Sequence, residues 1–324
     1  MKAALLKTLD GPEALCIGDV AEPVAGPGEV IVRVAAVGLN FADTLMTRGK
    51  YQHKPALPFS PGAEFAGTIE TIGTDVRPFV KGDRVAAYVT FGAAREKLAV
   101  VAASLIKIPE SVPDAIAAGA IVTYGTALHG LKDRGRLVAG ETVVVTGAAG
   151  GAGLAAVEIA KLLGARVIAV VSSDEKAKVA RDAGADATIV SSTSDLKNDV
   201  RAATGGNGAD VVYDCVGGAS AEPLIRALAW QGRFLVVGFA SGEIPKIPLN
   251  LLLLKGAEAT GVFWGDAVSR DAEGHRKNIR QIFNWISEGR LKPKTHGLYP
   301  LERIAEALAV IEGRKAEGKV ILTF

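Results

Sequence analysis

Short stretches in the first third of the chain alternate apolar and polar residues, which is the pattern of half-buried β-strands. Residues 29–36, 65–72 and 83–89 show this alternation, and Pro and Gly cluster between them at 23–28 and 55–62. Several short strands at such spacing predict an all-β barrel or sandwich in this part of the chain.

The pattern changes near residue 113, where an Ala-rich segment after a proline predicts a helix over residues 114–121. From residue 142 onward, β-branched runs alternate with segments of helical periodicity. Strands are expected at 142–146, 166–171, 187–190, 210–214, 234–238 and 260–263. Helices are expected between them at 151–163, 175–183 and 219–230. This alternation predicts an α/β fold with a doubly wound parallel sheet.

The last segment is helical at 278–288 and 301–312 and ends in a short apolar strand at 319–322. A strand that follows two helices can return to the sheet of the first domain, and the parallel-sheet domain is then an insertion. We therefore expect residues 1–121 to form the first part of the β domain, 122–264 the doubly wound domain, and 265–324 the return to the first domain.

A glycine-rich loop joins the first buried strand of the doubly wound domain to its helix. It reads Thr146-Gly147-Ala148-Ala149-Gly150-Gly151-Ala152-Gly153. Ala148, Gly150 and Gly153 give an A-x-G-x-x-G variant of the dinucleotide-binding fingerprint, with a strand before it and a helix after it. Such a loop lets the backbone approach a pyrophosphate and presents the N–H groups of a helix N-terminus to it. Residues 149–153 are therefore predicted to bind a dinucleotide, and the alternative is a glycine-rich turn with a structural role.

The end of the second strand of this domain indicates which dinucleotide binds. In NAD-binding domains an acidic residue at this point holds the ribose 2′-hydroxyl. This chain has Val171 followed by Ser172 and Ser173, with Lys176 nearby. Two hydroxyls and an ammonium favour a 2′-phosphate and therefore NADPH. Ser172 and Glu175 also have the spacing of a helix capping box, and both interpretations can hold together.

Composition excludes several classes of partner. The 324 residues carry a formal net charge of +2, so binding to nucleic acid or to an anionic membrane is not expected. The two cysteines lie far apart in sequence and provide neither a disulfide framework nor a structural zinc site. Residues 1–7 do not have the pattern of a signal peptide, and no apolar run is long enough to span a bilayer. The cytoplasm is therefore the expected location.

Several short motifs follow one another in a fixed order along the whole chain. They are Gly11-Pro12-Glu13-Ala14-Leu15, Val37-Gly38-Leu39-Asn40-Phe41-Ala42-Asp43, Arg48-Gly49-Lys50-Tyr51, Pro61-Gly62-Ala63-Glu64-Phe65-Ala66-Gly67, Val80-Lys81-Gly82-Asp83-Arg84-Val85, Thr123-Tyr124-Gly125-Thr126-Ala127, the glycine loop and Gly318-Lys319-Val320. Their order and spacing resemble those of the zinc-independent quinone oxidoreductases, the zeta-crystallin-like group of the medium-chain dehydrogenase/reductase superfamily. The resemblance implies a GroES-like β domain built from both termini, an inserted Rossmann domain, and a cofactor between them. It also implies a homodimer formed through the Rossmann domains, for which the apolar strand at 260–263 is a suitable edge.

The resemblance also implies that no metal takes part. Where the zinc enzymes of the superfamily carry ligands, this chain has Asn40, Ala63 and Gly119, and its four histidines lack metal-ligand spacing. Without thiolate and imidazole ligands a catalytic zinc ion has no site, so activation of an alcohol by a Lewis acid is not expected. Reduction of a quinone or an α,β-unsaturated carbonyl needs no metal.

By the same resemblance, Asn40 and Asp43 lie close to the nicotinamide and the substrate, and the Asn40 amide can donate to an acceptor carbonyl. Tyr51 resembles a tyrosine that donates a hydrogen bond or a proton to a developing enolate. Their alternatives are a turn residue for Asn40 and a loop tyrosine packed beside prolines for Tyr51. Further cofactor contacts are implied at Phe41, Tyr124, Thr126, Gly238, Phe239, Ala240, Phe263, Trp264, Gly265 and Lys319. Tyr124 equally fits a core residue at a domain junction, and Lys319 equally fits a residue that faces solvent.

Three functions remain open at this point. The leading hypothesis is NADPH-dependent reduction of a quinone. A second is reduction of the carbon–carbon double bond of an enone or an enoyl-CoA, for which Arg48, Lys50 and Lys54 beside Tyr51 offer a basic rim. A third, of another class, is a non-catalytic crystallin-like or RNA-binding protein, which the small net charge disfavours.

Overall fold

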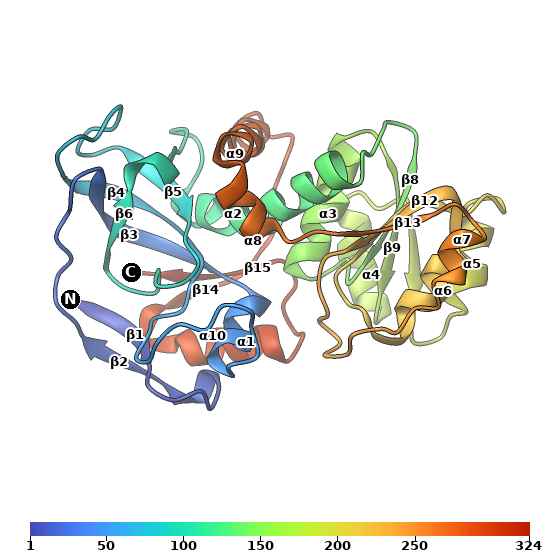
Figure 1. The fold of residues 1–324 in the computed structure, drawn as a ribbon, viewed down its shortest axis with the longest axis horizontal. Coiled ribbons are helices and arrows are strands. Elements are labelled where there is room, and N and C mark those ends of the chain that lie inside the picture. The colour runs from blue at the N-terminus through green and yellow to red at the C-terminus, as the bar shows by residue number, and fades with distance from the viewer. The chain divides into compact units, whose positions relative to one another are not determined.

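The computed structural model describes residues 1–324, which form two compact units (Figure 1). The first unit contains residues 1–122 and 268–324, and the second contains residues 123–267. The expected divisions, after residues 121 and 264, lie within a few residues of these. No helix combines the length and the apolar character needed to cross a lipid bilayer.

A seven-stranded sheet forms the body of the first unit. The strands lie in the order β14-β15-β3-β4-β5-β7, and β6 also pairs with β3. They are β3 (Glu29–Leu39), β4 (Glu64–Ile72), β5 (Arg84–Tyr88), β6 (Lys97–Val101), β7 (Ile106–Lys107), β14 (Thr295–Pro300) and β15 (Lys319–Thr323). The pairing is antiparallel except between β14 and β15. The last strand of the chain therefore completes the sheet that the N-terminal segment begins.

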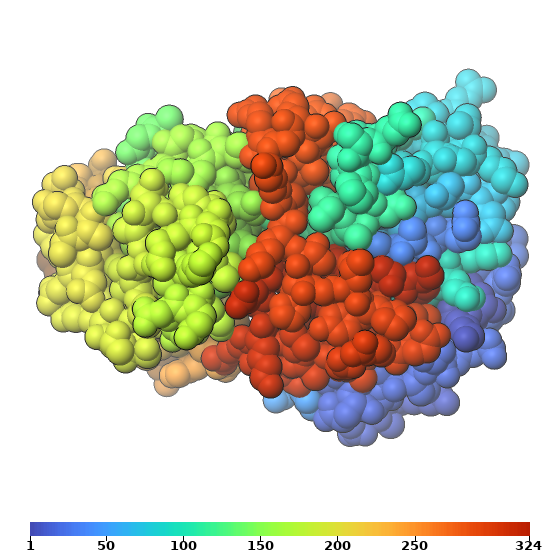
Figure 2. Space-filling view, turned by 180° about the vertical axis from the view of Figure 1, so that it is seen from behind, coloured from blue at the N-terminus to red at the C-terminus, as the bar shows by residue number.

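Helices and a strand pair cover this sheet. The helices are α1 (Phe41–Thr47), α2 (Asp114–Leu128), α9 (Ala272–Ser287) and α10 (Ile304–Glu312), and the pair is β1 (Lys2–Leu6) with β2 (Leu15–Asp19). Alternating side chains of β3 and β4, such as Val32, Val34 and Phe65, share one buried apolar cluster with Leu308 of α10. Figure 2 shows the C-terminal segment, in red, against the N-terminal segment, in blue, as the packing of α10 on α1 requires.

The second unit contains a six-stranded, entirely parallel sheet in the order β10-β9-β8-β11-β12-β13. Its strands are β8 (Thr142–Thr146), β9 (Arg166–Val171), β10 (Ala187–Val190), β11 (Ala209–Asp214), β12 (Leu228–Val236) and β13 (Glu258–Gly261). Its helices are α3 (Gly151–Leu162), α4 (Asp174–Asp182), α5 (Leu196–Ala203), α6 (Ala221–Arg226) and α7 (Asn250–Leu253), and α8 (Trp264–Arg270) follows β13. Counted from β8, this is the strand order 3-2-1-4-5-6 of a dinucleotide-binding fold. The predicted doubly wound sheet and the predicted fold class are therefore confirmed.

Three expected elements of this unit differ from the structure, and one is the strand expected at 234–238, which is β12 and runs from Leu228 to Val236. The helix expected at 219–230 ends at Arg226, because Leu228 is fully buried beside Ala209 as the first residue of β12, and the chain turns at Gln231 (φ 59°) before the strand continues. The strand expected at 260–263 is β13, which ends at Gly261. Trp264 and Gly265 therefore open helix α8 instead of ending a strand.

Candidate functional site

Three neighbouring strands of the first unit bring a cluster of polar side chains together. In the order β15-β3-β4, Val320 pairs with Leu39, and Gly38 pairs with Glu64. Lys319, one residue before Val320, therefore lies across from Asn40, one residue after Leu39. Sheet register alone thus assembles Lys319, Asn40 and Glu64 from three distant parts of the sequence.

The ammonium of Lys319 is held by two acceptors in the interior. Its Nζ donates to Asn40 Oδ1 at 2.5 Å and forms an ion pair with Glu64 Oε1 at 2.5 Å. Asn40 Nδ2 donates to Glu64 Oε1 at 2.8 Å, and the backbone N–H of Val122 donates to Glu64 Oε2 at 2.6 Å. Glu64 is 0% exposed and Lys319 5% exposed, so both charges are buried and compensated.

Two glycines make room for this pair. A Cβ at Gly38 would lie 2.5 Å from Glu64 Oε1, and a Cβ at Gly119 would lie 2.8 Å from Lys319 Cγ. Neither distance is compatible with an ordinary van der Waals contact. Any larger residue at these positions would therefore displace the carboxylate or the lysine stem.

Asp43, the acid predicted for the site, is completely buried in the first turn of α1. Its carboxylate accepts the backbone N–H of Asn40 at 2.8 Å and that of Gly62 at 2.9 Å. Burial raises the pKa of Asp43 to about 6, although the two hydrogen bonds and the charge of Lys319 favour its ionised form. Asp43 therefore fixes the backbone on both sides of the site and remains mostly ionised at neutral pH.

Two tyrosines border this cluster. Tyr51 is half-buried, packs against the apolar group of Leu6, Met46 and Phe59, and lies 5.8 Å from His53 between ring centroids. Burial, followed by the charge of Asp43, raises the pKa of Tyr51. Tyr88 lies opposite Glu64 in the β4–β5 register. Burial, followed by the neighbouring Tyr51, raises the pKa of Tyr88 to about 12. Both phenols are therefore protonated at neutral pH and can donate a hydrogen bond.

Tyr88 also lines a cavity of about 270 Å³ inside the first unit. The other lining residues are Val101, Ala103, Ser104, Val268, Ser269, Ala272, His275 and Arg276. Burial lowers the pKa of His275 to about 4, so this imidazole is neutral at pH 7. The cavity is thus mostly apolar, apart from Arg276, which donates to the carbonyl of Ala103.

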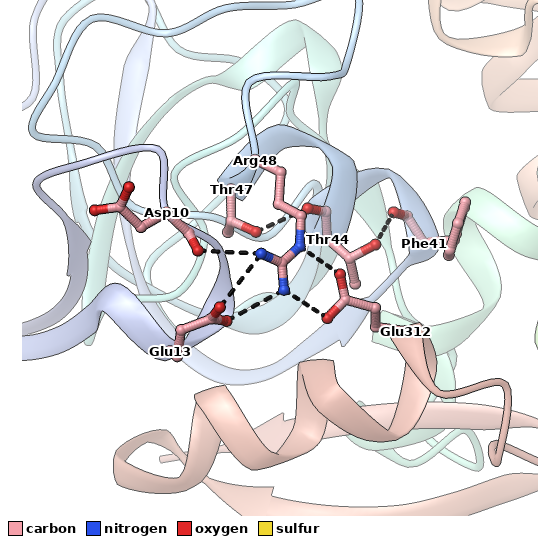
Figure 3. A network of polar contacts seen from close by, with 7 residues as sticks. All are labelled: Asp10, Glu13, Phe41, Thr44, Thr47, Arg48 and Glu312. Atoms are coloured by element: carbon pink, nitrogen blue, oxygen red, sulfur yellow. Dashed lines mark hydrogen bonds and ion pairs between the residues drawn. The ribbon is translucent and has the colours of Figure 1, made fainter. Parts of the chain in front are cut away.

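Arg48, expected beside Tyr51 as part of a basic rim, instead binds two carboxylates away from that rim (Figure 3). Its Nε and Nη2 donate to the two carboxylate oxygens of Glu312 at 2.6 and 2.9 Å, and Nη1 and Nη2 donate to Glu13 at 3.3 Å each. Nη1 also donates to the carbonyl of Asp10 at 3.1 Å. The guanidinium therefore ties the end of α1 to α10 and to the N-terminal segment.

The glycine loop of the second unit has the geometry that the fingerprint predicts, with one shift in position. The tight turn after β8 is made by Gly147, at φ 60°, instead of by Ala148. Gly150 is the N-cap of α3, and its N–H donates to the carbonyl of Gly147 at 3.0 Å. A Cβ at Gly153 would lie 2.2 Å from that carbonyl oxygen, so the first turn of α3 packs directly on the turn. The N–H groups at the start of α3 are thus placed to bind an anion.

Asp214, which sequence reasoning missed, organises the neighbouring loop. It ends β11 beside β8 and accepts the hydroxyl of Thr146 at 2.6 Å. It also accepts the backbone N–H groups of Val216 at 3.0 Å and Gly217 at 3.1 Å. This carboxylate therefore links the carboxyl ends of the two strands at which the strand order reverses, the usual ligand-binding edge of such a sheet.

The residues predicted for a 2′-phosphate lie together at the end of β9. Lys176 Nζ donates to Ser172 Oγ at 3.3 Å, and the Lys176 backbone N–H donates to Ser173 Oγ at 3.4 Å. Ser173, and not Ser172, is the N-cap of α4, because α4 begins at Asp174. The capping box expected from Ser172 to Glu175 is therefore wrong by one residue, and the Ser172 hydroxyl is left beside the lysine.

Tyr124 and Thr126 do not point the same way. They are two residues apart on α2, and such positions lie on nearly opposite faces of a helix. Tyr124 is buried, and its hydroxyl donates to Glu158 Oε2 of α3 at 2.5 Å, whereas Thr126 is half-buried. The Tyr124 hydroxyl therefore ties two helices of this unit together.

The remaining predicted cofactor residues follow strands or open helices. Ala240 donates its N–H to the carbonyl of Cys215 at 3.1 Å, and Phe239 packs on Gly217, so the loops after β11 and β12 are in contact. Phe263 is 49% exposed, whereas Trp264 is buried. Phe41 is the first residue of α1, where its carbonyl accepts from the Thr44 hydroxyl at 2.7 Å (Figure 3).

Glu64 and Tyr88 are site residues that the sequence reasoning did not select. Both signals were visible. Glu64 is an acid at the start of an otherwise apolar strand, and Tyr88 ends the strand that pairs with it. An acid that opens a buried strand predicts a buried partner of opposite charge. The partner, Lys319, comes from 255 residues later, as the two sequence positions show.

Comparison with known proteins places these two units in a family. Residues 26–110 match the alcohol dehydrogenase GroES-like domain, and residues 151–287 match the zinc-binding dehydrogenase family. Quinone oxidoreductase-like protein 2 of Mus musculus is 42% identical over 323 residues, covering 99% of this chain and 92% of that protein. The structure of a mycobacterial protein complexed with NADPH has a TM-score of 0.93 at 33% identity, covering 100% of both chains. Escherichia coli quinone oxidoreductase complexed with NADPH has a TM-score of 0.94 at 28% identity, again covering 100% of both chains. The chain therefore belongs to the quinone oxidoreductase family of the medium-chain dehydrogenase/reductase superfamily, a family of oxidoreductases.

Proposed function

We propose that this protein is an NADPH-dependent, metal-independent reductase that transfers a hydride to a quinone. The observation that carries the proposal is the buried cluster of Asn40, Asp43, Glu64 and Lys319, a polar site without thiolate or imidazole ligands. NADPH, when bound, would supply the hydride and its two electrons, and one proton then completes the hydroquinone.

The glycine loop fits the pyrophosphate of the dinucleotide. The close approach of α3 to the β8 turn and the free N–H groups at its start are the features that a pyrophosphate requires. Ser172 and Lys176 offer a hydroxyl and a positive charge to a 2′-phosphate, and no carboxylate ends β9. Two family members with known structures were solved with NADPH. NADPH is therefore the proposed cofactor, with Tyr124 contributing its ring and not its hydroxyl.

A metal does not fit the acceptor site. The positions that would supply ligands hold Asn40, Ala63 and Gly119, and no group of three or more His, Cys, Asp or Glu side chains is placed to bind a metal ion. The ammonium of Lys319 lies 2.5 Å from Asn40 Oδ1, so a divalent cation there would meet a like charge. No step of the proposed reaction passes through a metal.

The side chains of the chain then act on the acceptor by position and polarity. The Asn40 amide donates an N–H to the acceptor oxygen, and Asp43 holds the backbone of residues 40 and 62 in place. Tyr51, protonated at neutral pH, donates a hydrogen bond from its hydroxyl as negative charge develops on the acceptor.

A second candidate is reduction of the carbon–carbon double bond of a small enone, because the half-buried Tyr51 hydroxyl near Asp43 suits protonation of an enolate. A CoA thioester is disfavoured, since Arg48 is held by Glu312 and Glu13 and is not available to its phosphates (Figure 3). Only Lys50 and Lys54 remain of the expected basic rim.

We further propose a homodimer that forms at β13. This strand is the edge of the second unit's sheet, and three of its four residues are exposed. Exposed apolar side chains precede it in sequence or lie on its neighbour β12: Trp230, Ile244, Leu249, Leu253 and Leu254. An exposed edge beside an apolar patch suits pairing with a second copy. Sedimentation of the protein and of Leu253→Glu tests this: a stable monomer in the wild type would contradict it.

The deciding experiment follows the oxidation of NADPH and of NADH at the reduced-nicotinamide absorbance with a simple quinone, an unsaturated aldehyde and an enoyl-CoA. Turnover with NADPH and the quinone supports the proposal. Turnover with the aldehyde alone would replace it with the second candidate. If NADPH binds but no acceptor is reduced, both proposed reductase functions are contradicted. The non-catalytic hypothesis would then be tested by salt-dependent RNA binding.

A further inference from the structure

Stability alone does not explain the buried Lys319–Glu64 pair. Both charges are buried, with exposures of 5% and 0%. Desolvation of two such charges commonly offsets their attraction, so a buried ion pair is weak evidence for stabilisation. Gly38 and Gly119 are also needed to accommodate it. Because the ion pair gives little net stability and requires glycine at two other positions, we look for its role in the chemistry of the site.

The contacts of the pair settle the orientation of the Asn40 amide. An ammonium has only donors, so the atom that faces Lys319 Nζ at 2.5 Å is the amide oxygen. A carboxylate accepts, so the atom that faces Glu64 Oε1 at 2.8 Å is the amide nitrogen. A flipped amide would direct N–H groups at the ammonium and its oxygen at the carboxylate. Opposite charges on its two sides therefore hold Asn40 in one orientation.

This orientation leaves one hydrogen of the amide nitrogen available. The first N–H is directed to Glu64, and the second is directed only weakly to the carbonyl of Gly38, at 3.4 Å. A bond of that length lies at the limit of a hydrogen bond and is easily exchanged for a better acceptor.

We propose that Lys319 and Glu64 are a positioning pair for hydride transfer: they fix the Asn40 amide so that its available N–H is directed to the acceptor oxygen. The proposal rests on the proposed function. Hydride arrival places negative charge on that oxygen, and a preorganised N–H donor stabilises this transition state more than the ground state. Neither residue need touch the substrate.

The test compares Lys319→Met, Glu64→Gln and the double variant with the wild type. Each single variant leaves one buried charge without its partner and is expected to lower the thermal midpoint. The double variant removes both charges and is expected to recover most of the midpoint. Its kcat for quinone reduction is expected to stay about 100-fold below that of the wild type, the scale of a lost oxyanion donor. NADPH affinity, measured by titration, is expected to be unchanged because the glycine loop lies in the other unit.

Arg233→Met with Glu141→Gln is the matched control. That pair is also largely buried, with bonds of 2.6 and 2.8 Å, but it lies at the amino end of the second unit's sheet. The control double variant is expected to keep its kcat. A Lys319–Glu64 double variant that is folded and turns over like the wild type would overturn the proposal. A rise in the NADPH dissociation constant with unchanged kcat would overturn it as well, in favour of a phosphate contact by Lys319. Absence of turnover in the wild type would instead contradict the proposed function, on which the role depends.

Discussion

Substituting alanine for two glycines of one loop separates packing from ligand binding. At Gly153 a methyl group would lie 2.2 Å from the Gly147 carbonyl oxygen, about 1.2 Å short of the ordinary 3.4 Å contact, and also 2.9 Å from Ala148 Cα. These neighbours are backbone atoms of a tight turn and cannot rotate away. At Gly150 the new methyl group would meet the same oxygen at 3.4 Å, which the fold tolerates.

The expected free energies follow from two opposing effects. Alanine in place of a helical glycine stabilises by about 1 kcal/mol. Overpacking against fixed atoms costs about 1–3 kcal/mol and more where nothing can relax. Because the overlap at Gly153 is with backbone, we expect Gly153→Ala to lower the free energy of unfolding by about 2 kcal/mol after the helix gain is included. Gly150→Ala is expected to change it by less than about 1 kcal/mol.

Urea unfolding measures the change in stability, and titration with NADPH measures the change in cofactor binding. Gly150→Ala is expected to weaken NADPH binding without loss of stability, because its methyl group occupies space that the pyrophosphate needs. Gly153→Ala is expected to lower both the stability and the affinity for NADPH, since α3 must move away from the turn. If Gly153→Ala were as stable as the wild type, the close packing of α3 on the turn would be refuted as the reason for glycine at this position.

Three further predictions test other parts of the structure. Arg48→Met is expected to lower the urea midpoint of unfolding slightly, because its charge-assisted bonds to Glu312 are lost, and to leave the KM for an enoyl-CoA unchanged. A large rise in that KM would return Arg48 to the substrate site. Asp43 has a pKa raised from 3.8 to about 6, so its contribution to stability is fully present below pH 3.8 and falls by about 3 kcal/mol as the pH rises through 6. In urea titrations across this range, Asp43→Asn is expected to lose this pH-dependent part of the stability, and identical pH profiles of variant and wild type would contradict the prediction. Tyr124→Phe removes the donor of the 2.5 Å bond to Glu158 and is expected to cost about 1–2 kcal/mol by denaturant titration with little effect on NADPH affinity; a large loss of affinity would show that the hydroxyl serves the cofactor.

The second unit was the easier part to predict from sequence. Strands buried on both faces read as continuous apolar runs, and the expected bounds of β8 and β9 match the structure residue for residue. The bounds of the half-buried edge strand β10 match as well. Helix α1, with only seven residues, gives no periodic signal, and the short strands β1, β2, β6 and β14 lie among turn residues. Local pattern was therefore sufficient for the buried central strands, whereas the long helices α2 and α9 extend well beyond their expected bounds.

The cluster around Asn40 shows why the remainder was not predictable. Asn40, Asp43 and Tyr51 were selected by family resemblance, and Lys319 was selected for contact with a phosphate. The structure instead places Lys319 against Asn40 and Glu64. That contact depends on the register of β15 on β3, which no local pattern contains. The contacts of Lys319 therefore required the structure, and the roles of Asn40, Asp43 and Tyr51 stay predictions.

The pairing of β15 with β3 has a consequence for synthesis of the protein. Residues 123–267 can collapse around their own parallel sheet while the ribosome is still translating the rest. The first unit must wait, because Lys319 and its strand are among the last residues to be made. Until then Glu64 is a carboxylate without its cation, and the edge of β3 that receives β15 is open to other chains. The cluster around Asn40 thus forms only after translation reaches β15, and a nascent chain stalled before this point would carry a folded second unit and an incomplete first unit.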